Sequence, residues 1–103
     1  MIITTVDWVP GFDHHVLGLV IGSRPTFGTT YGEGIKDLHG HARPDVHLRY
    51  EEIRMGAVAY MVENARKLGA TAVVGVRFDH HEINGTWKEL CAYGTAVILE
   101  PSP

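Results

Sequence analysis

The sequence predicts a single α+β domain in two layers, with one long helix packed on an antiparallel sheet. Residues 45–68 repeat apolar side chains in steps of three and four, which is the helical period. Two β-prone runs precede this segment and two follow it, giving the order β-β-α-β-β. Asn84-Gly85, between the last two runs, is the strongest short hairpin signal. A chain of 103 residues suits one core, so residues 1–103 are expected to form one domain.

Two short strands are expected before the helix. Residues 2–7 (IITTVD) are β-prone, and the Pro-Gly pair that follows is a turn signal. Residues 15–22 (HVLGLVIG) form the second strand, and strict alternation would place Val16 and Val20 on one face. The same alternation would place Leu17, Leu19 and Ile21 on the other face.

A loop and the helix come next. Residues 23–34 hold one Pro and three Gly and are expected to be a loop, with a short helical piece at 33–39. Asp45 suits an N-cap, Arg66 and Lys67 suit the negative end of the helix dipole, and Gly69 suits the C-cap. The apolar or small residues of the predicted buried face are Val46, Tyr50, Ile53, Ala57, Met61, Ala65 and Leu68.

Residues 71–83 and 86–100 are the two strands of the hairpin. A two-residue type I′ loop at Asn84-Gly85 would place His80 opposite Glu89. The runs TAVVGV and GTAVIL are apolar on both faces, and a single helix layer covers only one face of a sheet. A partner subunit is expected to cover the other face. The alternative is that residues 23–44, with their short helix, fold over it.

Composition limits the partners. The formal net charge is -3 and the nine basic residues are scattered, which argues against nucleic acid and anionic membrane. Cys91 is the single cysteine, so one chain has neither an internal disulfide nor a multi-cysteine zinc site. The chain has no secretory signal pattern and no apolar run of the roughly 20 residues that a membrane helix needs. A cytoplasmic location is expected.

Two segments resemble a known family. LGATAVVGVRFD (Leu68–Asp79) and AYGTAVILEP (Ala92–Pro101), with the opening MIITT, resemble the YbjQ-like family of small bacterial proteins, which carries a heavy-metal-binding label. The resemblance implies a subunit similar to that of dodecin and a ring, commonly a homopentamer. It is weakest between Arg24 and Val46, where this chain reads HGHARPD in place of a Gly-Gly pair and an acidic residue. The family supplies no established ligand or catalytic residue to carry over.

The hairpin carries one candidate metal site. Asp13-His14-His15 and Asp79-His80-His81 are two similar triplets, but adjacent strand residues point to opposite faces and cannot share one ion. The predicted register instead groups nitrogen, oxygen and sulfur donors on one face, at cross-strand spacings that long side chains can bridge. These donors are His80, Glu82, Glu89 and Cys91. The alternative is a simple His80–Glu89 ion pair beside a buried, inert Cys91.

A second candidate metal site precedes the helix. His39 and His41 flank Gly40, and His47 follows. Imidazoles brought together by a loop suit zinc, copper or nickel. The alternative is that these are solvated loop histidines. A ring could complete either cluster, because one residue from each subunit can meet around a symmetry axis.

These observations favour a binding protein over an enzyme. The sequence has no phosphate-binding loop, dinucleotide fingerprint or serine elbow, and Cys91 with His80 lacks the usual activation of a thiol nucleophile. We expect a homo-oligomer that binds a divalent transition metal (zinc, nickel or copper) through imidazoles and carboxylates. The alternative is a non-catalytic ring-forming module without metal, or a small-molecule binder at subunit junctions lined by Trp8, Trp87 and Tyr93.

Overall fold

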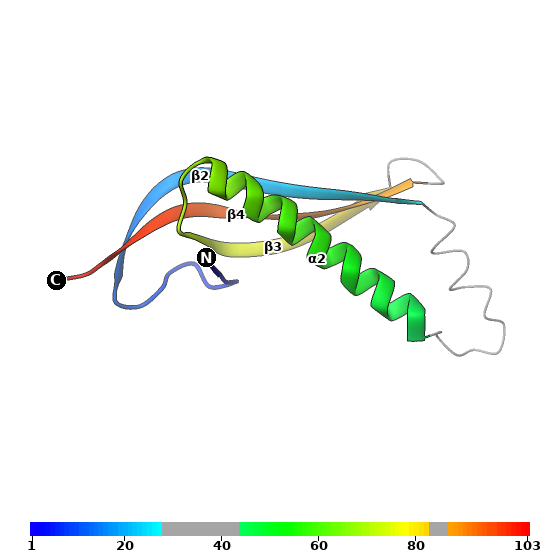
Figure 1. Ribbon diagram of the computed structural model, residues 1–103, viewed down its shortest axis with the longest axis horizontal. Helices are drawn as coiled ribbons and strands as arrows, with labels where there is room; N and C mark the ends of the chain where they lie inside the picture. Colours follow the sequence, from blue (N-terminus) through cyan, green and yellow to red (C-terminus); the bar gives the residue numbers. More distant parts are fainter. Residues whose placement is uncertain (28–43, 83–86) are drawn as a thin grey trace.

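The computed structural model confirms the α+β class. Its elements are β1 (Ile2–Ile3), β2 (Phe12–Phe27), α2 (Pro44–Lys67), β3 (Ala72–Glu82) and β4 (Trp87–Pro101). The structure describes residues 1–27, 44–82 and 87–103, with the backbone only at 25–27, 44–49, 81–82 and 87–88. α2 crosses one face of the sheet (Figure 1). We call the sheet face away from α2 the open face.

The sheet is mixed, which corrects the predicted antiparallel arrangement. The strand order is β1-β3-β4-β2. β2 and β3 both run antiparallel to β4, whereas β1 pairs with β3 in parallel. β1 is shorter than the predicted strand at 2–7, but hydrogen bonds to β3 continue past it. Thr4 N donates to Val73 O at 3.0 Å, and Gly75 N donates to Val6 O at 2.8 Å.

β2 is longer than predicted, and its faces differ from strict alternation. The strand continues through Pro25, which an outer strand tolerates because one of its edges needs no donor. A bulge between Val16 and Gly18 shifts the register against β4. An extra residue in one strand reverses the face on which each later side chain lies. Leu17 therefore packs in the core with Val20, while Val16 remains exposed.

The main core lies between α2 and the sheet. Ala57, Met61 and Ala65 are fully buried, so the predicted helical face is confirmed there, whereas Leu68 at its end is 49% exposed. Sheet residues that complete this cluster are Val20, Val73, Val76, Ala92 and Ala96. The helix lies close to β2 because Gly22 has no side chain. A Cβ at Gly22 would overlap backbone atoms of Ala57 and Met61.

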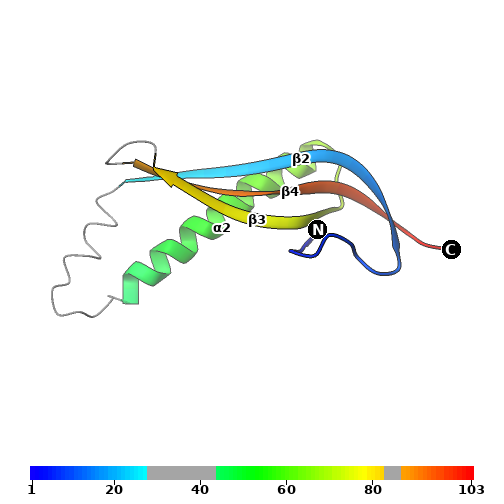
Figure 2. The same ribbon diagram turned by 180° about the vertical axis from the view of Figure 1, so that it is seen from behind.

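A second apolar cluster lies on the open face. It contains the buried Ala72, Val74 and Val97, with Val9 and Leu99 packed against it. Val9 belongs to residues 4–11, which we call the N-terminal strap. The strap leaves β3 and reaches β2 at the end of the sheet near the C-terminus (Figure 2). None of the helices that the structure describes is long and apolar enough to cross a membrane.

Candidate functional site

The β3–β4 register differs from the prediction by one residue. His80 pairs with Leu90, not with Glu89, and the partner of Glu89 is His81. A one-residue slip moves every side chain of a strand to the other face. His80 and Glu82 therefore occupy positions on the α2 side of the sheet, while Glu89 and Cys91 lie on the open face. The Asn84-Gly85 turn itself lies outside the described residues.

Long-range packing accounts for the observed register. Ala92 and Ala96 are fully buried under α2, and a Cβ at Gly94 would meet Val73 and Val76. These small residues of β4 must face the helix, which sends Cys91 to the opposite face. β3 matches this orientation of β4 through an irregularity in the pairing of the two strands. The irregularity lies between Val74 and Arg77, where Gly75 has φ +62°. A local turn signal contains none of this information.

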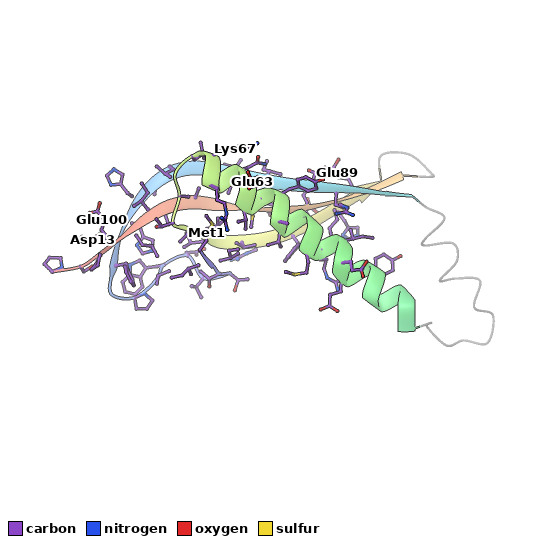
Figure 3. The ribbon with its side chains drawn as sticks, viewed as in Figure 1. Met1, Asp13, Glu63, Lys67, Glu89 and Glu100 are labelled. Carbon is purple, nitrogen blue, oxygen red and sulfur yellow. The ribbon has the colours of Figure 1, made fainter. Side chains whose placement is uncertain are left out.

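The open face brings together a thiol, a carboxylate and a hydroxyl. The Cys91 thiol donates to Glu89 Oε1 at 2.9 Å, and Ser23 Oγ donates to the same oxygen at 3.3 Å. Ser23 Oγ also lies 3.4 Å from Cys91 Sγ. We call Ser23, Glu89 and Cys91 the thiol–carboxylate cluster. Glu89 lies toward the hairpin end of the sheet, and Asp13 and Glu100 lie at the other end (Figure 3).

The position opposite Cys91 on β3 adds a second carboxylate. Asp79 pairs with Cys91, and Ser23 pairs with Cys91 from the other side. Directly opposed residues share a face of the sheet. The open face therefore carries two carboxylates, a thiol and a hydroxyl across three adjacent strands. Sequence reasoning placed Asp79 on the other face because it used the wrong register.

The surroundings of Cys91 keep its thiol protonated. Burial raises the pKa of Cys91 above its ordinary value, and the hydrogen bond to Glu89 raises the pKa further. The Ser23 hydroxyl acts in the opposite direction, while the negative charges of Glu89 and Asp79 disfavour the thiolate. A thiol nucleophile needs a lowered pKa. His80 is also on the wrong face to serve as a base for Cys91.

The described side chains fit a metal ion only in part. A thiolate and carboxylates suit zinc and similar ions, and Cys91 and Glu89 are already in contact. However, the side chains that the structure describes include no group of three His, Cys, Asp or Glu close enough to hold an ion. His39 and His41 lie outside the described residues. His47 lies on the first turns of α2, where the structure describes the backbone only.

A hollow on the open face was not predicted. It has a volume of about 270 Å³ and lies where the strap crosses the sheet. Its lining residues are Asp7, His14, Val16, Val74, Gly75, Thr95 and Val97. The Asp13-His14-His15 triplet marked this region in the sequence. The hollow forms where the strap crosses the sheet, and no local sequence pattern predicts that crossing.

The open face also exposes apolar side chains beyond the hollow. Val16 is 67% exposed and Leu19 is 66% exposed, and Ile21 and Tyr93 extend the same surface. Register places all four residues on the side away from α2. We call these four residues the open-face patch. Among the predicted aromatic residues, Trp8 and Tyr93 are exposed, while the side chain of Trp87 lies outside the described atoms.

Comparison with known proteins finds a matching family model and several relatives. A family model, YbjQ_1, described as "Putative heavy-metal-binding", matches residues 1–100. A UPF0145 protein of Saccharolobus islandicus is 37% identical over 102 residues, covering 94% of this chain and 89% of its own length. A UPF0145 protein of Methanothermobacter thermautotrophicus is 37% identical over 106 residues, covering 98% and 92%. One from Thermus thermophilus is 38% identical over 106 residues, covering 99% and 93%.

A solved structure shares the fold. It is a protein of unknown function of the DUF74 family from Pediococcus pentosaceus. The TM-score is 0.68 at 15% identity, covering 97% of this chain and 98% of the other. At that identity the likeness concerns the fold alone.

Proposed function

The chain belongs to the YbjQ_1 (UPF0145) family, and from this premise we propose that it is a homo-oligomer that binds a divalent transition-metal ion. The proposed first site is on the open face, with Cys91 and Glu89 as ligands. The observation that carries the proposal is the 2.9 Å contact between Cys91 Sγ and Glu89 Oε1. Sulfur and carboxylate donors together suit zinc.

Further donors can come from β3 and from the segment before α2. Asp79 pairs with Cys91 and His81 pairs with Glu89, so both positions belong to the open face and extend the proposed ligand set. His39, His41 and His47 remain a second proposed donor set. The corrected register removes His80 and Glu82 from the first site, which makes His80 a useful control.

Metal uptake by Cys91 requires loss of the thiol proton. Because the pKa of Cys91 is raised, the ion must displace a proton at neutral pH. Affinity should therefore increase as the pH rises toward that pKa. Affinity should decrease as the pH falls, because the thiol and then the imidazoles are protonated more completely.

Calorimetric titration of the tag-free protein with zinc, nickel and copper at neutral pH tests the proposal. We expect uptake with proton release, and a loss of affinity of at least about tenfold in Cys91→Ser and Glu89→Gln. His80→Ala, on the opposite face, should bind as the wild type does. No uptake of any of the three ions would exclude the proposal. Equal loss in His80→Ala would exclude this location for the site.

A second candidate is a ring-forming module without metal, and the open-face patch favours it. Contiguous exposed apolar surface is a feature of interfaces. Native mass spectrometry of metal-replete, untagged protein separates the two candidates. An assembly with stoichiometric metal supports ion binding. An assembly that stays metal-free on titration, and that is unchanged in Cys91→Ser and His39→Ala, supports the module, with the pentamer as the expected size.

A further inference from the structure

His14 makes two contacts with the N-terminal strap that the proposed metal site does not use. Its Nε2 atom accepts a hydrogen bond from Val9 N at 3.0 Å, in a partly buried position. Its ring stacks on Trp8, with centroids 6.4 Å apart and planes at 25°. Both contacts lie where the strap crosses from β3 to β2.

The bond to Val9 fixes the protonation state of His14. A backbone N–H can donate only to a ring nitrogen that carries no proton. The imidazole that holds Val9 is therefore neutral, with its proton on Nδ1. An imidazolium carries protons on both nitrogens and cannot accept this bond.

This bond holds the part of the strap that covers apolar surface. Val9 packs on Ala72, Val74 and Val97, the second cluster of the open face. The first half of the strap is held separately, through backbone bonds of Thr4 and Val6 to β3. Loss of the Val9 bond would therefore loosen the middle of the strap and leave its start in place.

Groups from the strap and from two strands surround His14. From the strap, Asp7 lines the same hollow as His14. Trp8, also from the strap, stacks on the His14 ring. On β4 the residue paired with His14 is the uncharged Leu99. On β3, Arg77 donates to Thr5 O of the strap at 2.8 Å, and the hollow is lined there by Val74 and Gly75.

We propose that His14 is a protonation-controlled latch. The neutral ring holds Val9 and keeps the strap closed over the second apolar cluster. Uptake of a proton removes the acceptor of the Val9 amide and frees the strap around Val9. Histidine takes up this proton near physiological pH, so the open face would be more exposed in acidic conditions than in neutral ones.

Amide hydrogen exchange of the full-length protein, followed by NMR between pH 8 and pH 5, tests the latch. The protection factor of the Val9 amide, which corrects for the intrinsic pH dependence of exchange, should fall by about fivefold or more on acidification, the factor that corresponds to one net hydrogen bond. In a Trp87→Phe background, Trp8 emission should change with the same midpoint.

Substitutions at His14 separate a latch from a merely structural contact. Glutamine can accept the Val9 bond but does not titrate, so His14→Gln should keep Val9 protected at every pH. His14→Leu should leave Val9 unprotected at every pH. His15→Gln, at the neighbouring position on the other face, should retain the wild-type pH dependence.

Two results would overturn the proposal. The first is a Val9 protection factor that stays constant across the pH range in the wild-type protein. The second is a His14→Gln variant that shows the same pH dependence as the wild type, since the titrating group would then lie elsewhere.

Discussion

The pKa of Cys91 is set by burial and by two polar neighbours that act in opposite directions. Glu89 raises the pKa of Cys91 through the hydrogen bond and through its charge, whereas the Ser23 hydroxyl lowers that pKa. The folded chain thus contains a partly exposed thiol that reacts slowly. Such a thiol resists oxidation, yet it remains available to an ion that can displace its proton.

Glu89→Gln should speed the alkylation of Cys91 by iodoacetamide in metal-free protein at pH 7.5. The rate should rise several-fold, because each pKa unit recovered increases the thiolate fraction about tenfold. Ser23→Ala should slow the reaction. The differences should disappear at a pH above the pKa of every variant. Faster alkylation in Ser23→Ala would contradict the assigned roles.

At the scale of elements, the helix was predictable and the pairing of the strands was not. α2 spans Pro44–Lys67 against the predicted 45–68, because the helical period and the cap residues are local signals. The register of β3 on β4 was wrong by one residue, because it depends on which residues of β4 face α2. Ala92 and Ala96 decide that question by packing with residues of α2, which are distant from them in the sequence.

The candidate site was predictable in composition but not in grouping. Cys91 and Glu89 are two residues apart on one strand, so alternation placed them on one face whatever the register. Their partners across the sheet depend on the register, and Asp79 was therefore missed. Ser23 was missed because Pro25 and the nearby glycines indicated a loop, where β2 continues as an outer strand.

Two glycine substitutions test how closely α2 approaches β2. Gly22→Ala should destabilise the fold by about 1–3 kcal/mol, as overpacking does, because the new methyl group would overlap the backbone of Ala57 and Met61. Gly56→Ala meets only the flexible end of the Arg24 side chain and should stabilise the helix by up to about 1 kcal/mol. Urea unfolding at one fixed protein concentration measures both. Equal effects would contradict the close contact.

At the scale of the whole molecule, a single chain is thin and elongated. Its extents are 59 × 25 × 16 Å and its radius of gyration is 16.8 Å, against about 13 Å for a compact domain of this length. One helix covers one face of the sheet, and the strap covers part of the other. The open-face patch is the surface on which the proposed assembly would add a further layer.

Leu19→Glu should weaken that assembly. The substitution places a charge in the centre of the open-face patch, where burial without a partner is costly. Tyr60→Glu, on an exposed position of α2, is the matched control and should leave the mass unchanged. Light scattering after size exclusion measures the mass. An unchanged assembly in Leu19→Glu would show that the patch is not the contact surface.

The strand order also determines when the sheet can be completed. β2 pairs with β4 from Phe12–Pro101 to Phe27–Trp87, so its partner is synthesised only after α2 and β3. α2, β3 and β4 are consecutive and can form early, because closing short loops costs little entropy. β2 is thus synthesised before α2, β3 and β4 but docks after them. Until then, a nascent chain exposes a 16-residue segment with an unpaired backbone, which is the stage at which chaperones would matter most.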